Sequence, residues 1–252
     1  MSVPIALQLY SVRQDCAQDL LGVIRQVAAM GYDGVEFAGY HGHSAADIKA
    51  VLDETGLKAA GTHTALSQFD DENFDSTVEL HKTLDCKFAI IPWIPDEQRN
   101  SAEACLKTSA RLTELVERLR PLGLRTGFHA HAGDMEPLDN GQCAWDIFAA
   151  NTPPDFILQY DTANGMAGGA DPVKPITDWP GRNASLHLKE WKGTHGAIIG
   201  EGDVPWPRVF EAAERGGGVE WYVVEHEEDS EITPMESVDR CLKNLKKLLG
   251  RS

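Results

Sequence analysis

Residues 184–189 read Ala-Ser-Leu-His-Leu-Lys, a short apolar run that carries polar side chains at its end. Three other runs in the same half of the chain have this form, and they end in Phe-His129-Ala-His131, Gln-Tyr-Asp161 and Val-Val-Glu225. Parallel strands that alternate with helices place their carboxyl ends at one common face. The four runs therefore predict polar groups that converge from four successive strands.

The same alternation of short apolar runs with helical segments extends along the whole chain and gives eight units. We predict strands at residues 5–9, 34–37, 58–62, 88–92, 125–129, 156–161, 184–189 and 221–225. We predict helices that begin near Asp19, Ser44, Asp71, Ala102, Gln142, Asp171, Trp206 and Thr233. No GxGxxG follows the first run, so eight units favour an α/β fold closed as a (β/α)8 TIM barrel over an open sheet.

Helix ends in this pattern carry familiar residues. Ser44 is expected to cap a helix, and Gly31, Gly56 and Gly123 stand where left-handed turns end helices before a strand. No Pro- or Ser-rich linker divides the 252 residues, a usual length for one barrel. We therefore expect residues 1–252 to form a single TIM-barrel domain.

Composition excludes several classes of partner. The chain has 23 Lys and Arg against 39 Asp and Glu, a formal net charge of −16, which disfavours nucleic acid and anionic lipid surfaces. The apolar stretch at residues 3–9 is too short for a signal peptide and nothing approaches a membrane span, so we expect a cytoplasmic protein. The five cysteines form no CxxC pair and are expected to be reduced packing residues.

The polar strand ends predict a metal site. Each one alone has a structural explanation, because a strand-end Asp often caps a helix and a lone His is often only hydrogen bonded. Together they supply two imidazoles and two carboxylates, a set suited to one divalent ion such as Mn, Co, Zn, Fe or Mg. The predicted ligands are His129, Asp161, His187 and Glu225, with His131 as the alternative to His129.

These strand ends, with three further segments, resemble the xylose isomerase-like sugar isomerase/epimerase superfamily. The further segments are Leu7-Gln-Leu-Tyr-Ser-Val-Arg13, Gly31-Tyr-Asp-Gly-Val-Glu36 and Gly200-Glu-Gly-Asp-Val-Pro-Trp206. The resemblance covers essentially the whole chain. Members of the superfamily differ in chemistry, and include sugar epimerases, hydroxypyruvate isomerases, inosose and dehydroshikimate dehydratases, and endonuclease IV.

The resemblance implies that Asp161, His187 and Glu225 are the metal ligands of the sixth, seventh and eighth strands. The fifth-strand ligand in such proteins is usually Glu, and the matching position here is His129, in a His-Ala-His variant. Epimerases of the superfamily use two metal-bound glutamates as acid and base on opposite sides of the substrate carbon. The replacement puts such a symmetrical mechanism in question.

Other residues near the strand ends are candidates for catalysis or substrate binding. Lys189 points to the same side of its strand as His187, and is predicted either to reach a substrate oxygen or to pair with an acid such as Glu36. His131 is predicted to act as acid or base, with ligation and a structural role as alternatives. His63 matches a His that many relatives place near the substrate, so it is predicted to bind substrate. The alternative is that it forms hydrogen bonds within its own loop.

A second group of candidates would bind the substrate. Glu36 ends the second run and is predicted to bind a substrate hydroxyl, or to be an ion-paired carboxylate. Tyr10, Trp93 and Trp191 fall at predicted strand ends, where a flat aromatic face suits a sugar, although packing explains them equally well. The acidic run at residues 226–231 is expected to be a solvated loop rather than a metal site.

The function we expect is metal-dependent isomerisation or epimerisation of a sugar or keto-polyol. Glu225, with His131 and Lys189, would transfer a proton through a metal-stabilised enediolate. The alternative is a lyase or dehydratase that acts on a keto-inositol or 3-keto-glycoside, since elimination needs one base and one acid. A non-catalytic sugar-binding barrel is a third hypothesis, and the acidic chain disfavours an endonuclease. Few basic residues stand at the strand ends, which disfavours a phosphorylated substrate, and a homo-oligomer is left open.

Overall fold

Eight strands alternate with helices in the computed structural model, which describes residues 2–227 and 232–251. The strands are β1 (Ile5–Gln8), β2 (Gly34–Phe37), β3 (Lys58–His63), β4 (Phe88–Ile91), β5 (Arg125–His129), β6 (Ile157–Gln159), β7 (Ser185–Leu188) and β8 (Trp221–Val224). They form one parallel sheet in the order β6-β5-β4-β3-β2-β1-β8-β7. Every strand overlaps a predicted one.

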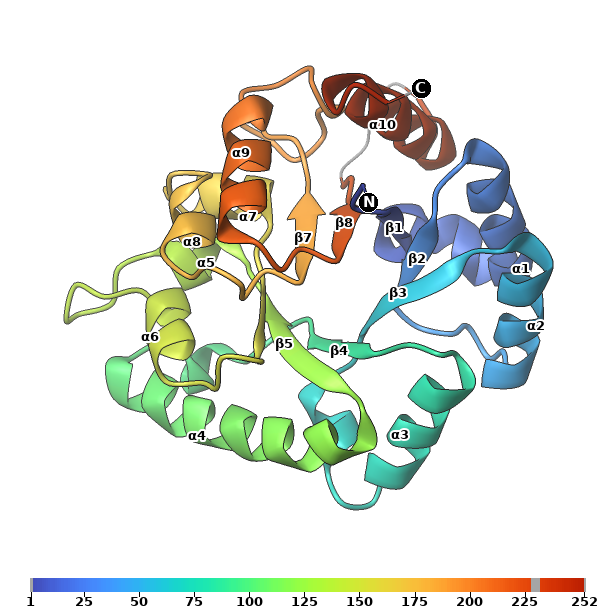
Figure 1. The fold of residues 1–252 in the computed structure, drawn as a ribbon. Coiled ribbons are helices and arrows are strands. Elements are labelled where there is room, and N and C mark those ends of the chain that lie inside the picture. The colour runs from blue at the N-terminus through green and yellow to red at the C-terminus, as the bar shows by residue number, and fades with distance from the viewer. Residues whose placement is uncertain (1, 228–231, 252) are drawn as a thin grey trace.

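The sheet closes between its two edge strands, β6 and β7. Asp161 and His187 form a parallel bridge there, and the His187 amide donates to the Tyr160 carbonyl at 2.9 Å. A second hydrogen bond, from the Leu158 amide to the Arg182 carbonyl at 2.8 Å, also joins the segments around β6 and β7. We call this junction of β6 and β7 the seam of the barrel. Figure 1 shows the resulting ring of strands enclosed by helices. The (β/α)8 TIM barrel predicted from the alternation is confirmed.

Helices follow the strands around this ring. The longer ones are α1 (Arg13–Met30), α2 (Ala45–Thr55), α3 (Phe74–Thr83), α4 (Ala102–Leu119), α6 (Ala144–Ala150), α9 (Trp206–Gly216) and α10 (Pro234–Leu248). Short helices α5 (Ala132–Met135), α7 (Thr162–Ala167) and α8 (Lys174–Thr177) lie between β5 and β7, and 3-10 turns follow β1, β3, β4 and α4. The sequence did not predict α5 and α7, because one or two turns give no periodic signal.

Capping chemistry sets several helix ends as predicted. Ser44 Oγ accepts a hydrogen bond from the Asp47 amide, and Gly31, Gly56 and Gly123 all adopt left-handed conformations. The predicted start of the first helix at Asp19 was wrong, because helical structure begins at Arg13. Asp19 instead interrupts α1 with non-helical dihedrals (φ −155°, ψ 78°) and caps its second part by accepting from the Gly22 amide.

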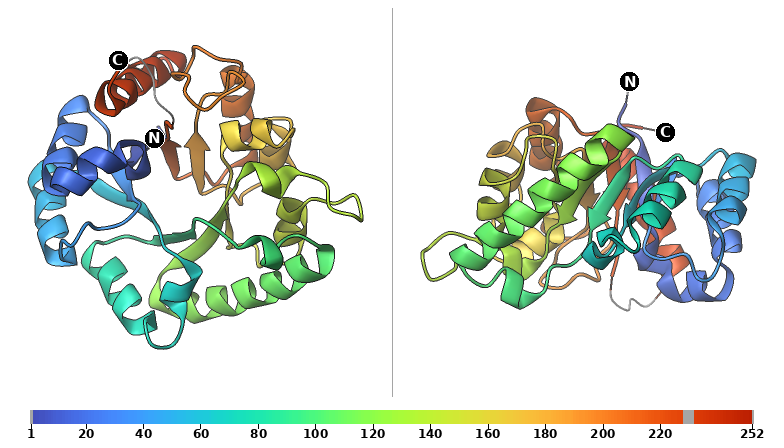
Figure 2. Two further views of the ribbon diagram at one scale, coloured as in Figure 1. Left: turned by 180° about the vertical axis from the view of Figure 1, so that it is seen from behind. Right: turned by 90° about the horizontal axis from the view of Figure 1, so that it is seen from below.

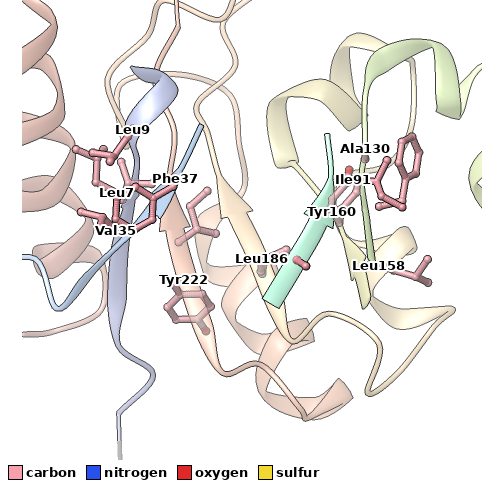
Figure 3. Packing of buried hydrophobic residues seen from close by; sticks show 14 of the residues in the cluster. Leu7, Leu9, Val35, Phe37, Ile91, Ala130, Leu158, Tyr160, Leu186 and Tyr222 are labelled. Atoms are coloured by element: carbon pink, nitrogen blue, oxygen red, sulfur yellow. The ribbon is translucent and has the colours of Figure 1, made fainter. Parts of the chain in front are cut away.

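Side chains alternate across each strand, so every strand contributes to two cores. Outward residues such as Leu7, Val35, Leu158 and Leu186 pack between the strands and the helices (Figure 3). Inward residues fill the barrel, where an apolar layer that includes Phe88, Ile157 and Trp221 lies below a polar layer. The polar layer occupies the carboxyl ends of the strands, where a TIM barrel carries its site.

The two ends of the described chain meet at one side of the barrel, as the side view in Figure 2 shows. The Arg251 guanidinium donates to the Val3 carbonyl at 2.7 Å, which ties them together. Among the described residues, none of the helices is both long and apolar enough to span a bilayer. All five cysteines are unpaired, and four of them are buried.

Candidate metal and substrate site

The four predicted ligands converge at the carboxyl end of the barrel. His129 ends β5, Asp161 follows β6, His187 lies in β7 and Glu225 follows β8. Their ligand atoms all lie within 4.8 Å of one another, and all four residues are buried. His131 does not belong to this cluster, so the structure brings His129 into the fifth-strand position. The convergence follows directly from four parallel strands that end at one face.

Asp161 supplies an observation that tests whether a cation fits. Its Oδ1 accepts from the Asn164 amide at 2.7 Å and so caps α7, but its Oδ2 is buried and has no hydrogen-bond partner among the described residues. Burial raises the pKa of this carboxyl to about 6, although Lys189 acts in the opposite direction. A buried carboxylate oxygen without a donor costs free energy unless a proton or a cation satisfies it. Two imidazoles and a second carboxylate within reach make a divalent ion the fitting partner.

His187 lies between two carboxylates. Its Nδ1 is 2.6 Å from Glu225 Oε2 and its Nε2 is 2.7 Å from Glu36 Oε2. Burial opposes a charge on the imidazole, but Glu36 and Glu225 outweigh burial and raise the pKa to about 10. Nδ1 faces the ligand cluster, so an ion bound there would replace one proton of this ring.

Glu36 does not line a cavity but lies beneath the cluster, with none of its surface exposed. Its carboxylate accepts from Gln8 Nε2 at 2.7 Å, Gln159 Nε2 at 2.8 Å and His187 Nε2 at 2.7 Å. Burial alone would raise its pKa, but His63 and His187 lower the pKa well below the ordinary value. The predicted contact with a substrate hydroxyl has no support in this geometry, because the carboxylate is enclosed by protein donors.

Lys189 is also enclosed rather than open to a ligand. Its Nζ lies 3.3 Å from Glu225 Oε1 and 2.6 Å from Glu227 Oε1, and the side chain is 1 % exposed. Burial disfavours the ammonium charge, yet Glu225, Asp161 and Glu227 together raise its pKa. Of the two predicted roles, the structure shows the ion pair, with Glu225 and Glu227 as partners instead of Glu36.

A cavity of about 630 Å³ opens above the cluster, and both His129 and Glu225 line it. Tyr10 and Trp93, which are 43 % and 51 % exposed, stand at its wall. His131 also lines it, with its ring edge-on to Trp93 at a centroid separation of 5.1 Å. Tyr10 and Trp93 therefore lie where a substrate contact was predicted, and His131 lies on the same cavity, where it was predicted to act as acid or base. Trp191 is not among the lining residues and packs on His195 instead.

His63 joins the cavity to the polar layer below. It lines the cavity, and its Nε2 lies 2.9 Å from Gln159 Oε1 and 3.2 Å from Glu36 Oε2. Its ring stacks on that of His187, with centroids 5.6 Å apart. With His129 and His187 it forms a second group of potential ligand atoms that overlaps the first.

Several polar residues of the site escaped the sequence analysis, among them Gln8, Gln159, Asn164, Arg99 and Glu227. A signal exists for the two glutamines, since each interrupts an apolar run, and Gln159 stands two positions before Asp161 and so faces the same side. Glu227 belongs to the acidic run that was expected to be solvated. It pairs with Lys189 and lines the cavity, while residues 228–231 of that run lie outside the described residues.

Comparisons with known proteins agree with this architecture. Residues 24–248 match the xylose isomerase-like TIM barrel family. The chain belongs to this family. Its curated relatives include inosose dehydratase of Geobacillus kaustophilus, 27 % identical over 195 residues that cover 67 % of this chain and 61 % of the relative. Another is the rhizopine catabolism protein MocC of Rhizobium meliloti, 24 % identical over 272 residues that cover 91 % of this chain and 83 % of MocC.

Solved structures share the fold at lower identity. A sugar phosphate isomerase/epimerase from Parabacteroides distasonis has a TM-score of 0.84 at 23 % identity, over 98 % of both chains. An IolI protein with a bound zinc atom has a TM-score of 0.77 at 16 % identity, again over 98 % of both chains. The present family member therefore shares its whole barrel with these proteins.

Proposed function

We propose that this barrel is a divalent-metal-dependent enzyme that moves a proton at a carbon beside the carbonyl of an unphosphorylated sugar or keto-polyol. The observation that carries the proposal is the buried His129, Asp161, His187 and Glu225 cluster, whose Asp161 Oδ2 has no hydrogen-bond partner. It forms part of the floor of a cavity large enough for a monosaccharide. The zinc atom in the IolI structure is consistent with this site.

The four clustered residues would hold the ion. When bound, the ion would act as a Lewis acid that stabilises negative charge on the oxygens of the substrate. Glu225 faces the cavity, and Lys189 and His187 hold its carboxylate by contacts at 3.3 and 2.6 Å. Burial opposes ionisation, but in the metal-free protein Lys189 and His187 lower the pKa of Glu225. With an ion at His187 Nδ1, Lys189 would still favour the ionised carboxylate, which can accept the substrate proton.

His131 would serve as the second proton-transfer group. His131 lies just after β5 and lines the same cavity, and burial lowers its pKa to about 4. The neutral imidazole can accept a proton at pH 7 and return it. In isomerisation, Glu225 would return its proton to the neighbouring carbon. In epimerisation, Glu225 would later release its proton to solvent, while His131, after taking up a proton from solvent, would give it to the opposite face of the same carbon.

The walls of the cavity favour a neutral polyol over a sugar phosphate. Tyr10 and Trp93 offer flat faces that suit the C–H surface of a sugar ring. Arg99 is the single Arg or Lys among the described lining residues, and Asp134 at 2.9 Å and Asp96 at 2.5 Å already neutralise it. By sequence, residues 228–231 are Glu-Asp-Ser-Glu and add no cation.

The experiment is solvent exchange in D2O with protein loaded separately with Mn, Co, Zn, Fe or Mg. Unphosphorylated ketoses, aldoses and keto-inositols would be followed by proton NMR for loss of the signal beside the carbonyl. We expect exchange with at least one such substrate and metal, and a loss of 100-fold or more in Glu225→Gln, as an order of magnitude for a proton-transfer group. Glu220→Gln, at an exposed carboxylate that pairs with Arg125, is the matched control.

Failure of exchange across the whole panel, under every metal, would refute the proposal. Ligand binding that survives Glu225→Gln without turnover would indicate a sugar-binding barrel instead. Faster exchange with the phosphorylated counterparts of these sugars, measured in the same way, would overturn only the proposal that the substrate is unphosphorylated.

A lyase reaction is the second candidate, and two observations favour it. His129 stands where a two-glutamate epimerase would have a carboxylate, and one curated relative is inosose dehydratase. The present chain spans 61 % of the length of that relative, so its activity is taken only as a candidate. Here Glu225 would take the proton, and His131, after taking up a proton from solvent, would pass it to the departing β-hydroxyl, which leaves as water. An ultraviolet-absorbing enone that disappears in His131→Ala would distinguish elimination from isomerisation.

A further inference from the structure

The amide of Gln159 can be oriented in only one way. Its Nε2 lies 2.8 Å from Glu36 Oε1 and 2.8 Å from Ser185 Oγ. An ionised carboxylate only accepts hydrogen bonds, so the Gln159 atom that faces Glu36 must be the NH2 group. The opposite end of the amide, Oε1, therefore faces His129 Nδ1 at 3.0 Å and His63 Nε2 at 2.9 Å.

This orientation dictates which nitrogen of His129 carries hydrogen. An amide oxygen can only accept, so Nδ1 of His129 must be an N–H donor. In a neutral ring the other nitrogen, Nε2, is then bare and can bind a metal ion. Asn164 Nδ2 lies 3.5 Å from this Nε2, which also agrees with a nitrogen that accepts.

Glu36 imposes the complementary constraint on His187. Its Oε2 lies 2.7 Å from His187 Nε2 and so requires a hydrogen on that nitrogen. The remaining nitrogen, Nδ1, is the one that faces Glu225 and lies 4.0 Å from Asp161 Oδ2. The two imidazoles would therefore offer different nitrogens to an ion, and each choice follows from a buried acceptor below the site.

We propose that Glu36 and Gln159 are positioning residues that select the tautomers of the two histidine ligands, so that His129 offers Nε2 and His187 offers Nδ1 to the ion. Gln8 supports the pair, because its Nε2 donates to Glu36 at 2.7 Å while its Oε1 accepts from the Tyr10 amide at 3.0 Å. All three side chains are fully buried, so water does not compete for these bonds. The inference rests on the proposed metal site.

The tautomer can be measured directly on metal-free protein. Long-range proton–nitrogen NMR spectra of nitrogen-15-labelled protein distinguish a bare ring nitrogen from a protonated one. We expect His129 to show a protonated Nδ1 and a bare Nε2. The opposite tautomer in the wild-type protein would overturn the proposal without any variant.

Variants then connect the tautomer to binding. Gln159→Met removes the acceptor at similar volume, and we expect a mixture of His129 tautomers and a loss of zinc affinity of about 10- to 100-fold, by chelator competition. Ser185→Ala is the control, because it removes the hydrogen bond between Gln159 Nε2 and Ser185 Oγ and keeps the amide oxygen that faces the two histidines. It should keep the tautomer, with zinc affinity within about threefold. An unchanged tautomer and affinity in Gln159→Met would refute the assignment.

The outcomes separate this inference from the proposed function. A wild-type protein that has the expected tautomer but binds no divalent ion would support the tautomer assignment and refute the proposed metal-dependent enzyme. A protein that binds zinc tightly but has the opposite His129 tautomer would refute the tautomer assignment and leave the proposed function standing.

Discussion

Asp161 shows how one side chain can have opposite effects on folding and on binding. Its Oδ1 caps α7, while its Oδ2 is buried without a donor, and burial raises the pKa from 3.8 to about 6. The folded chain therefore binds this proton more tightly than the unfolded chain. In metal-free protein the resulting cost to stability is present above about pH 6 and disappears as the pH falls toward 4.

Asp161→Asn should consequently stabilise the metal-free protein at pH 8 and abolish tight metal binding. A shift of this size corresponds to a gain of about 1–3 kcal/mol in the free energy of unfolding, because one pKa unit is worth 1.36 kcal/mol. Urea unfolding of both proteins with a chelator present, at pH 8 and pH 4, measures the gain. A variant that is less stable than wild type at pH 8 would contradict the account of the unpartnered oxygen.

His187 determines how metal affinity should depend on pH. Glu36 and Glu225 raise its pKa to about 10 against the effect of burial, so binding at Nδ1 must release one proton throughout the neutral range. The logarithm of the affinity should therefore rise by about one per pH unit between pH 7 and 9. Zinc titrations by calorimetry in buffers of different ionisation enthalpy measure the released proton. A flat profile would show that His187 is not a ligand.

The sequence predicted three of the metal-ligand candidates well but did not reveal the residues that surround them. Asp161, His187 and Glu225 were recognisable because each ends an apolar run, and the structure brings them together. Glu36 was predicted either to bind a substrate hydroxyl or to be an ion-paired carboxylate, and the structure shows the second role, with His187 as its partner. Its burial depends on Gln159, which is 123 positions away in the chain, and on His187, at a separation of 151. Local pattern alone cannot reveal such partners.

At the scale of elements, the pairing of β5 with β6 leaves no room for a side chain at Gly127, below the site. Gly127 pairs with Ile157, and His129 pairs with Gln159 two residues further along. A Cβ at Gly127 would lie 2.6 Å from Ile157 Cβ, so the backbones must separate to admit it. That separation would also pull His129 away from Gln159 Oε1.

Gly127→Ala should therefore cost about 1–3 kcal/mol of unfolding free energy, the usual cost of overpacking, and should also weaken zinc binding. Gly216→Ala, at the end of α9, is the matched control, since the nearest atom that a Cβ there would meet outside its own helix is Ile176 O at 3.7 Å. Thermal unfolding and chelator competition on both variants test the prediction. Equal behaviour of the two variants would show that the close approach is not required.

Element positions were more predictable than their precise ends. The strands lie where apolar runs indicated, because a parallel strand is buried on both faces and loses its polar alternation. The start of α1 was misjudged because Asp19 is a genuine capping residue that happens to stand inside a longer helix. A cap identifies a helical start, but it does not exclude helical residues before it.

At the scale of the whole molecule, the metal ligands stand on both sides of the barrel's closure. The hydrogen-bonded sheet runs from β6 round to β7, and these two edge strands are joined through the Asp161–His187 bridge. Those same two residues are predicted ligands of one ion. The sequence predicted eight units and hence closure, but it gave no indication of where the seam lies.

An ion held by Asp161 and His187 should therefore stabilise the seam between β6 and β7 against local opening. Hydrogen exchange of the His187 amide, which donates to the Tyr160 carbonyl at 2.9 Å, should slow by about 100-fold when free zinc is 100 times its dissociation constant. The Thr64 amide, which donates to the Ile90 carbonyl at 2.7 Å away from the seam, should slow much less. Equal slowing at the two amides would show that the ion stabilises the barrel only as a single cooperative unit. Slowing confined to the seam would show that the metal site also closes the fold.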